Sequence, residues 1–359
     1  MYRRAVATAR ARDRCRERLL QLSGSSLDPE SIQHEAIADL QRVIGFERWC
    51  WPLADPQTLL PLAGAAEHDY GPGVARSLEL EYSGTDFAAM DVLARSVVPV
   101  GSLSAETGRD LARSPRWDEI LRPVGIGDEA SLACRDALGC WGWLKADRDS
   151  ADPAFDQLDL DLLAQVGASL GSALRRKTGR PGAAAAVPPR APGVIVLDRD
   201  LRPVSWTQGA RGWVEELPLS GLFAMWGMLP AVVYPAAALA RAGTDASEAH
   251  ALERGVSGRW IMVEAAPLDG EDDERIAVVL RAAAPSETFD LLCRAYALTK
   301  RERELVAGLM AGLDTRALTQ RLVISRHTVQ DHLKSVFAKV DVRSRRELLA
   351  TFSGTAELS

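Results

Sequence analysis

Residues 325–340 combine side chains that form hydrogen bonds with apolar residues at helical spacing. Val329, Leu333, Val336 and Val340 recur every three or four residues, which predicts one buried face of a helix. The opposite face carries groups that can bond to phosphate oxygens or to base edges. These are Arg326, His327, Gln330, Asp331 and Lys334. The pattern therefore indicates a helix built to enter a groove of DNA.

Neighbouring residues predict the elements that would position this helix. Thr299 and Glu302 form the capping-box pattern of a helix start, and Asp314 is a suitable cap for a second short helix. Residues 323–325 then form a turn that leads into the third helix. A fourth helix is expected to begin at Ser344 and to brace the third. Two short helices joined by a tight turn predict a helix-turn-helix.

Charge is distributed unevenly along the chain. The net charge of the whole chain is −6, which argues against a general nucleic-acid binder. Residues 298–352 hold eleven Lys and Arg against six Asp and Glu, a net charge of +5, so the rest of the chain carries −11. An acidic body with a basic C-terminal segment predicts that double-stranded DNA is bound at that end.

Residues 298–350 resemble the LuxR-type DNA-binding domain. The resemblance rests on "LTKRERELV", "ALTQRLVIS", "TVQDHLKSVFAKV" and "VRSRRELLA", which align with the family pattern without a gap. It implies an all-α four-helix domain, which we place at residues 290–355. For His332, packing against the second helix is an equal alternative to DNA contact. The candidate DNA-binding residues are Arg326, His327, Thr328, Gln330, His332, Lys334, Lys339, Arg316 and Arg345.

Several residues depart from the pattern of that family. Val323 and Asp341 stand where Gly is usual, so local packing is expected to differ, although Asp tolerates a tight turn better than most residues. Gln330 stands where Lys or Arg is common. Its amide is suited to reading adenine instead of adding affinity for phosphate.

The chain before this domain divides near its middle. Residues 1–24 predict an Arg-rich N-terminal helix, and residues 178–192, rich in Pro, Gly and Ala, predict a linker. A weaker break is expected at residues 282–287. The sequence therefore predicts two further domains, one on each side of the linker.

Residues 25–177 predict an α+β domain. An amphipathic helix over residues 31–44 precedes strand-like runs, "ASLACRD" and "CWGWLKA" form a hairpin, and "FDQLDLDLLAQVGASLGSALRRK" ends the domain as a long helix. The stretch from "GIGDEASLACRD" through that helix resembles a GAF domain, which implies a sensor of small molecules or proteins. Cyclic-nucleotide GAF domains carry an Asn-Lys-x-Phe-Asp motif, and this chain has no Asn. That subtype is therefore disfavoured.

Residues 193–284 predict a second sheet. "GVIVLDRDLRPVSWT" is expected to form strand, turn and strand, while "RWIMVEAAPL" and "ERIAVVLRAA" form a hairpin, with helices between the two units. This arrangement is similar to a PAS domain. Large aromatic side chains dominate small cores, and they also line ligand cavities. The aromatic candidates for ligand contact are Trp206, Trp213, Trp226 and Trp260.

Composition predicts a soluble, cytoplasmic protein. Hydrophobic residues make up 47% and charged residues 26% of the chain, and no apolar run approaches the ~18 residues of a membrane span. The five Cys are scattered and lack CxxC spacing, as expected in a reducing compartment. No group of His, Cys, Asp or Glu has metal-ligand spacing, so we expect no metal and no cofactor.

Other protein classes fit less well. Residues 167–171, "GASLG", match the G-x-S-x-G pattern of serine hydrolases, but Ser169 falls inside a helix rather than at a strand-to-helix turn. We therefore expect no enzymatic activity, and the small residues favour a close helix contact, for example in a dimer. Response regulators begin with an apolar strand that ends in paired acids, which is missing here. Acyl-homoserine-lactone receptors have one sensor domain, whereas this chain predicts two.

The predicted fold class is multidomain α+β, with GAF-like and PAS-like α/β sensor domains followed by an all-α four-helix helix-turn-helix domain. The predicted function is transcription regulation by a homodimer that responds to an unidentified small-molecule or protein effector. The alternative is a sensory scaffold that acts through protein contacts without binding DNA.

Overall fold

The computed structural model describes most of the chain. Most of the predicted linker, residues 180–189, and the first seven residues of the predicted N-terminal helix lie outside the described residues. The described ranges are 8–25, 27, 29–67, 71, 73–82, 84, 86–179, 190–243, 249–269 and 274–354.

The first half of the chain forms an antiparallel sheet of five strands. The strands are β1 (Arg48–Ala54), β2 (Pro61–Glu67), β3 (Val100–Ser102), β4 (Ile126–Asp136) and β5 (Gly139–Asp149). They lie in the order β2-β1-β5-β4-β3. The predicted hairpin is β4–β5: Asp136 pairs with Gly139, and the Asp136 carboxylate accepts from the Leu138 backbone N–H at 2.8 Å, which closes the turn.

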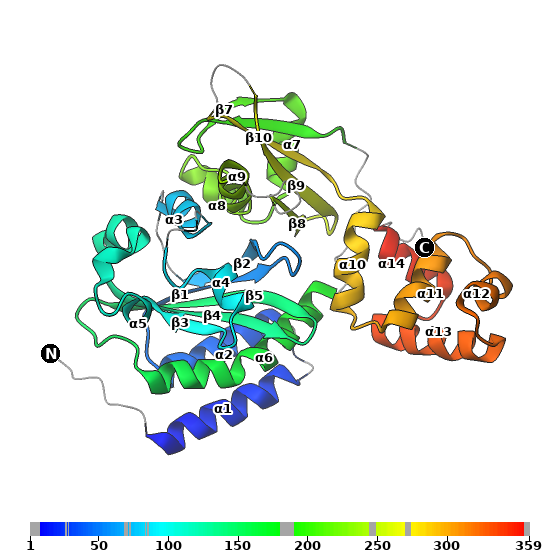
Figure 1. Cartoon of the computed structure of the whole chain (residues 1–359), viewed down its shortest axis with the longest axis horizontal. Coiled ribbons are helices and arrows are strands. Elements are labelled where there is room, and N and C mark those ends of the chain that lie inside the picture. The colour runs from blue at the N-terminus through cyan, green and yellow to red at the C-terminus, as the bar shows by residue number, and fades with distance from the viewer. Residues whose placement is uncertain are drawn as a thin grey trace.

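Three helices cover one face of this sheet and build the main core with it (Figure 1). They are α1 (Ala9–Ser23), α2 (Pro29–Val43) and α6 (Gln157–Gly179). Leu132 and Cys134 of β4 belong to this core, whereas Ala133 between them packs with Met90 on the other side, as strand alternation requires. The short elements of that side are α3 (Gly73–Tyr82), α4 (Met90–Arg95), α5 (Leu103–Glu106), η1 (Leu111–Arg113), η2 (Trp117–Leu121) and η3 (Arg122–Val124).

The small residues of α6 allow this helix to approach β4 closely. A Cβ atom at Gly171 would lie 2.8 Å from the Cys134 backbone, and one at Gly167 would lie 3.0 Å from the Leu132 side chain. The close contact expected around "GASLG" is therefore made within the chain, between helix and strand. Ser169 lies inside α6, as the sequence indicates.

A second antiparallel sheet follows the linker. Its strands are β6 (Gly193–Leu197), β7 (Pro203–Trp206), β8 (His250–Arg254), β9 (Trp260–Pro267) and β10 (Ile276–Ala282). Their order, β7-β6-β10-β9-β8, repeats the order of the first sheet. All but β8 were expected from the sequence. The helices between its strands are α7 (Gln208–Glu216), α8 (Ser220–Met225) and α9 (Val233–Arg241).

The two sheet domains share buried surface. Leu60 and Leu62, beside and within β2, and Tyr82 of α3 belong to the same apolar cluster as the core of the second sheet. Polar contacts flank this cluster: Glu253 of β8 accepts from the Ala63 backbone N–H at 2.6 Å. Arg241 of α9 pairs with Glu79 of α3. The two domains are therefore joined through β2 and α3 on one side and β8 and α9 on the other.

One helix that the sequence did not predict connects the sheets to the C-terminal domain. It is α10 (Pro285–Ala295), which begins at the expected weak break. Arg175 of α6 donates to the Ala295 carbonyl at 2.8 Å. The ring of Phe352 lies 5.8 Å from that of Phe289 and 6.0 Å from that of Tyr296. The C-terminal helices α11 (Lys300–Met310), α12 (Thr315–Leu322), α13 (Arg326–Val340) and α14 (Arg345–Ser353) then form a separate lobe (Figure 1).

Candidate functional site

The α12–turn–α13 unit is built by capping side chains. Asp314 accepts from the Ala317 backbone N–H at 2.7 Å, and Ser325 Oγ accepts from the Thr328 backbone N–H at 3.1 Å. Val323 ends α12 in the left-handed conformation with φ of 53°, and the Ile324 N–H bonds to the Thr319 carbonyl at 3.2 Å. These local bonds satisfy helix ends that would otherwise lack partners, so the turn is fixed tightly.

The helix α13 has one buried and one exposed face, as predicted. Val329, Leu333, Val336 and Val340 are at most 2% exposed and belong to the core shared with α11, α12 and α14. The other face points to solvent. Its exposed side chains are Arg326, His327, Gln330, Asp331 and Lys334.

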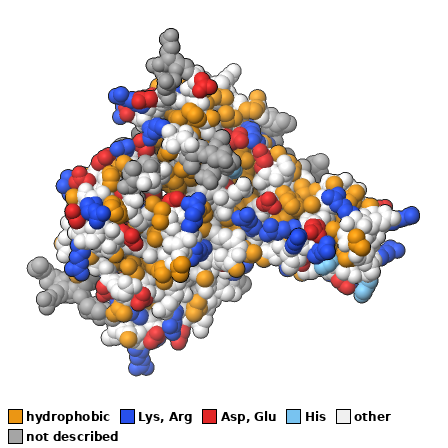
Figure 2. All heavy atoms as spheres, in the orientation of Figure 1, with side chains coloured by type: hydrophobic (Ala, Val, Ile, Leu, Met, Phe, Trp, Pro, Cys, Tyr) orange, Lys and Arg blue, Asp and Glu red, His pale blue; other side chains and the backbone are white. Residues whose placement is uncertain are grey.

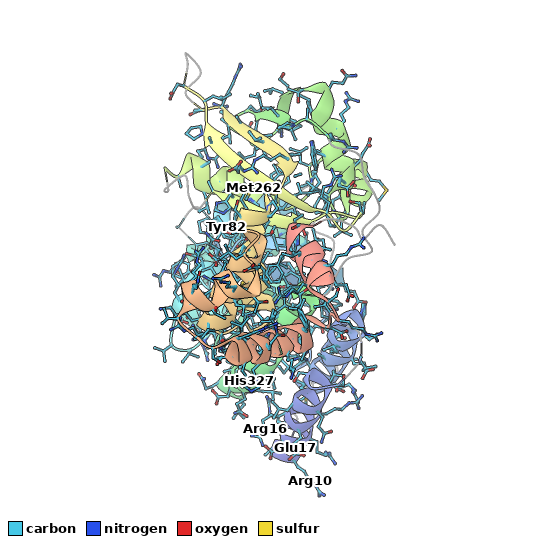
Figure 3. The ribbon with its side chains drawn as sticks, turned by 90° about the vertical axis from the view of Figure 1, so that its right-hand side faces the viewer. Arg10, Arg16, Glu17, Tyr82, Met262 and His327 are labelled. Carbon is cyan, nitrogen blue, oxygen red and sulfur yellow. The ribbon has the colours of Figure 1, made fainter. Side chains whose placement is uncertain are left out.

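The exposed stripe lies on the outer side of the lobe. Arg326, Gln330 and Lys334 follow one another at intervals of four residues, so they share a line along α13. Figure 3 shows His327 on the side of α13 that faces away from the other helices. Its Nε2 lies 3.5 Å from the carboxylate of Asp331, and both side chains are well exposed. Figure 2 shows Lys and Arg side chains gathered around this lobe.

The other sequence candidates have different surroundings. Thr328 is half-buried, and its Oγ1 lies 2.9 Å from Ser325 Oγ at the helix cap. His332 is half-buried, and Arg316 is exposed on the first turn of α12. Arg345 of α14 donates to Thr315 Oγ1 at 2.8 Å, which ties α14 to the start of α12.

Lys339 is an exposed residue of α13 that forms an ion pair with Glu302 of α11. Its Nζ donates to Glu302 at 2.6 Å and to the Ala297 carbonyl at 3.2 Å. Burial alone would raise the pKa of Glu302, but hydrogen bonds from Lys339, Ser335 and Thr299 outweigh burial and lower that pKa to about 2. Lys339 therefore joins α13 to the start of α11, whereas Arg326 and Lys334 form no ion pair with any residue that the structure describes.

The four Trp candidates are not brought together. Trp213 is fully buried in the second core and donates from Nε1 to the Ala191 carbonyl at 2.8 Å. Trp260 is 9% exposed and lies under the Arg254 guanidinium. Trp206 is 38% exposed on β7. The structure has a cavity between the two sheet domains, and Trp226 is the one of these four Trp residues that lines it.

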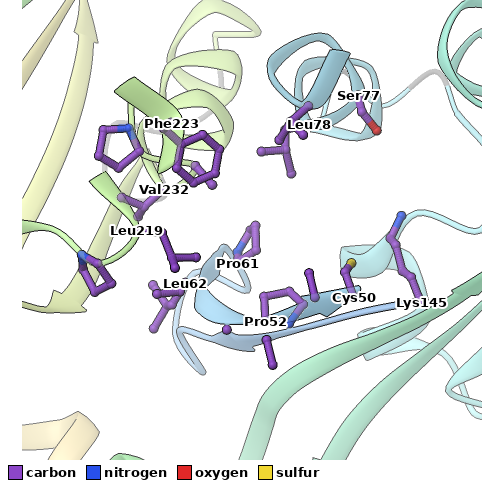
Figure 4. Close-up of a pocket in the computed structure, with 18 of the residues that line it drawn as sticks. Cys50, Pro52, Pro61, Leu62, Ser77, Leu78, Lys145, Leu219, Phe223 and Val232 are labelled. Atoms are coloured by element: carbon purple, nitrogen blue, oxygen red, sulfur yellow. The ribbon is translucent and has the colours of Figure 1, made fainter. Parts of the chain in front are cut away.

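That cavity has a volume of about 160 Å³. Figure 4 shows Pro61 and Leu62 facing Leu219 and Phe223 across it, with Cys50 and Lys145 at one end. The sequence interpretation missed this site because its walls come from distant segments. A usable signal was the placement of Glu129 and Lys145 within strands β4 and β5, whose apolar character predicts burial.

Two features are absent from the described part of the chain. Within it, no group of three His, Cys, Asp or Glu side chains is arranged to hold a metal ion. The described helices also include none that is both long enough and apolar enough to cross a membrane.

Comparison with known proteins identifies the C-terminal lobe. Residues 296–352 match the family described as "Bacterial regulatory proteins, luxR family". The chain is 42% identical over 55 residues to the "Putative HTH-type transcriptional regulator in exeN 3'region" of Aeromonas salmonicida. It is 40% identical over 53 residues to the "Monoamine regulon transcriptional regulator" of Klebsiella aerogenes. Each alignment covers 15% of this chain, and they span 28% and 23% of those relatives.

One solved structure shows a weak likeness to part of this chain. The phycoerythrobilin-bound GAF domain of a cyanobacterial phytochrome superposes with a TM-score of 0.31 and 15% identity. The superposition covers 45% of this chain and 93% of that domain.

Proposed function

We propose that the chain is a sequence-specific DNA-binding transcriptional regulator, and that α13 enters the major groove. One observation carries this proposal: a helix-turn-helix that matches the luxR family presents Arg326, Gln330 and Lys334 to solvent, and none of the three forms a hydrogen bond or ion pair with another described side chain. A major groove admits one α-helix, and its bases are read by such donors. We assign phosphate contacts to Arg326, Lys334 and Arg316, and base contact to Gln330, with His327 beside them.

The remaining candidates take supporting places in this proposal. Thr328 and His332 lie at the border of the exposed stripe, where a small shift would bring them to the groove. Lys339 and Arg345 would contact phosphate only after leaving Glu302 and Thr315, so their main contribution is to hold α13 and α14 in position.

Charge favours binding at this end of the molecule. The lobe carries a net charge of +5 over residues 298–352, whereas the rest of the chain carries −11. Phosphate repels an acidic body and attracts a basic lobe, so DNA is oriented toward α13 as it approaches.

The two sheet domains are proposed to be the sensors. We assign residues 25–177 to a GAF-like domain and residues 193–284 to a PAS-like domain, supported by the two five-stranded antiparallel sheets of matching strand order. An effector, either a small molecule or a protein, would bind them in the cytoplasm. Its binding would shift the population of molecules that are competent to bind DNA.

The route from the sensors to the lobe runs through α10. This helix contacts α6 through Arg175 and the core of the lobe through Phe289 and Tyr296. A displacement of α6 or of the second sheet would therefore move the base on which α14 rests. We further propose a homodimer whose two α13 helices meet an inverted repeat about one DNA turn apart, ~34 Å.

Genomic DNA capture by the purified full-length protein tests this function. Wild type should enrich a short inverted repeat, and the Gln330→Ala, Lys334→Ala double variant should not. The Arg199→Ala variant is the control for loss of a surface side chain. Arg199 is exposed in the second domain and lies far from the C-terminal lobe in the sequence. Equal enrichment by wild type and double variant would remove the assignment of α13. Absence of enrichment by wild type, with and without cell extract, would favour the protein scaffold.

A further inference from the structure

The cavity between the two sheet domains has apolar walls from both. Leu62 of β2 and Leu78 of α3 form one side, while Leu219, Phe223 and Val232 form the other. Its volume of about 160 Å³ is close to that of an apolar cavity that holds benzene, ~150 Å³. The space therefore suits a molecule with a body the size of one ring.

One end of the cavity is polar and buried. Arg116 donates to Asp86 at 2.6 Å and to Glu129 at 2.9 Å, and its side chain is 1% exposed. Lys145 Nζ lies 2.9 Å from Glu81 and 3.2 Å from Glu129. Both cations thus bridge strands β4 and β5 to segments on the cavity side of the sheet. Such a network fixes the positions of its members before any ligand arrives.

One donor in this network is left over. Arg116 lines the cavity, and its Nη2 is buried without a hydrogen-bond partner among the described residues. An unsatisfied donor on a buried charged group is costly, and an acceptor placed there recovers that cost. Arg116 Nη2 is therefore a buried donor that an accepting oxygen would satisfy.

The charges around Arg116 determine whether the accepting oxygen should belong to a charged or a neutral ligand. Glu81, Asp86 and Glu129 outnumber Arg116 and Lys145, so an additional anion would be repelled by the surplus carboxylate. An ammonium cation has no lone pair to accept a hydrogen bond from Arg116 Nη2, and it would lie beside the positive charges of Arg116 and Lys145.

On the opposite wall of the cavity, the carboxyl group of Glu253 already accepts hydrogen bonds from the protein. Glu253 accepts from the Ala63 N–H at 2.6 Å through Oε2 and from the Arg254 N–H at 2.9 Å through Oε1. A neutral molecule with an accepting oxygen meets the free donor and adds no charge, so it suits both walls.

We propose that this cavity is an effector site for a small neutral molecule with an apolar, ring-sized body and one hydroxyl or carbonyl oxygen, which accepts a hydrogen bond from Arg116. That the ligand controls DNA binding rests on the proposed function, whereas binding of the ligand to the cavity does not. Because the walls come from both sensor domains, an occupant would also tie Leu62 and Leu78 of the first domain to Phe223 of the second.

A matched series of probes tests the chemistry with the full-length protein and no DNA. The probes are benzyl alcohol, ethylbenzene, benzoate and benzylammonium, which share a ring and differ at one end. Calorimetric titration near pH 7 should give benzyl alcohol the lowest Kd, about threefold to tenfold below that of ethylbenzene. Benzoate and benzylammonium should bind more weakly than benzyl alcohol. Tighter binding of either ion, or no binding of benzyl alcohol, would overturn the proposal.

A pair of variants tests the location. Leu219→Trp narrows the cavity from a side chain that is 48% exposed, so folding should tolerate it. Met225→Trp is the control, because Met225 is 75% exposed on the same segment and does not line the cavity. Benzyl alcohol should bind Leu219→Trp about tenfold more weakly and Met225→Trp as it binds wild type. Equal binding to all three proteins would place the site elsewhere. DNA capture is measured separately, so its failure leaves these results unaffected.

Discussion

The proposed DNA contacts predict different effects for the exposed side chains of α13. Lys334 is a point charge suited to phosphate, so Lys334→Ala should weaken binding to matching and non-matching duplexes alike. The slope of log affinity against log salt should become shallower by about 1. Fluorescence anisotropy at about 50 and about 200 mM salt measures both effects. An unchanged slope would exclude phosphate contact by Lys334.

Gln330 should behave in the opposite way. Its amide can bond an adenine edge, so Gln330→Ala should cost about 1–3 kcal/mol on the preferred duplex and relax preference at one base pair. The salt slope should stay as in wild type. Anisotropy with duplexes that differ at single positions measures this. A uniform loss across all duplexes would instead make Gln330 a positioning residue.

Glu302 should make the lobe sensitive to acid. Hydrogen bonds from Lys339, Ser335 and Thr299 lower its pKa from the usual 4.5 to about 2. The depressed pKa means that the stabilisation is full above about pH 4.5 and is lost as pH falls toward 2. Amide hydrogen exchange in α11 reports this locally, after correction for intrinsic exchange. Glu302→Gln should lower protection at neutral pH and remove the acid-induced loss, and the same pH profile in both proteins would contradict the assignment.

Among single residues, sequence predicted the faces of α13 well and the partners of basic side chains poorly. The 3.6-residue period fixes which side of a helix is buried, so Val329 and Lys334 could be assigned from spacing alone. Lys339 and Arg345 instead meet Glu302 and Thr315, which lie on other helices. Such pairs depend on tertiary packing, and helix periodicity carries no information about them.

The turn between α12 and α13 stores backbone strain. Val323 has φ of 53° and is 87% exposed, so its side chain gains little from packing while its Cβ crowds the left-handed backbone. Val323→Gly should stabilise the lobe by about 0.5–1 kcal/mol, seen as stronger exchange protection in α12. Val323→Ala keeps a Cβ and should give a smaller gain. A loss of protection in Val323→Gly would mean that Val323 packs usefully.

The contact between α6 and β4 should tolerate no side chain at its closest point. Gly171→Ala would place a methyl group 2.8 Å from the Cys134 backbone, which should destabilise the first domain by about 1–3 kcal/mol. Thermal unfolding followed by Trp fluorescence measures this. Ala168→Gln, at an exposed position on the same helix, is the control. Equal melting temperatures for both variants would show that α6 can move away from β4.

Elements followed from sequence where local signals were strong. The β4–β5 hairpin and the caps of α12 and α13 depend on residues that are close together in the sequence, so they could be predicted. Strand β8 was missed because five residues give too short an alternation. Helix α10 does not follow from the sequence in this way, because the composition around Pro285 indicates a break, whereas Pro at the first helical position also favours a helix start.

At the scale of the whole molecule, the joint between the sheet domains should respond to pH. Burial raises the pKa of Glu253 from 4.5 to about 7, so the fold favours the protonated carboxyl. Its contribution is complete below about pH 4.5 and is lost as pH rises through 7. Exchange protection of β2 and β8, corrected for intrinsic rates, should therefore fall as pH rises from about 6 to about 8. This window extends about one pH unit to either side of the Glu253 pKa. Glu253→Gln should remove the dependence, and identical profiles would contradict it.

The relation between the domains is the part of the fold that sequence could not supply. Leu62, Leu78 and Phe223 come together from both sides of the linker, and Arg116 reaches the same cavity from another segment. The local periodicity of a sequence can indicate that an apolar residue faces inward, but it does not indicate which distant residue it contacts. The cavity and the α10 connection to the lobe therefore emerge only from the assembled chain.

We propose above that the C-terminal lobe reads DNA sequence through α13. The most direct measurement is an equilibrium titration of the full-length protein against the captured repeat and a shuffled duplex of the same composition, at one salt concentration. We expect binding to the repeat to be tighter by roughly a thousandfold or more, and most of that preference to be lost in Gln330→Ala. Equal affinity for the two duplexes would contradict it.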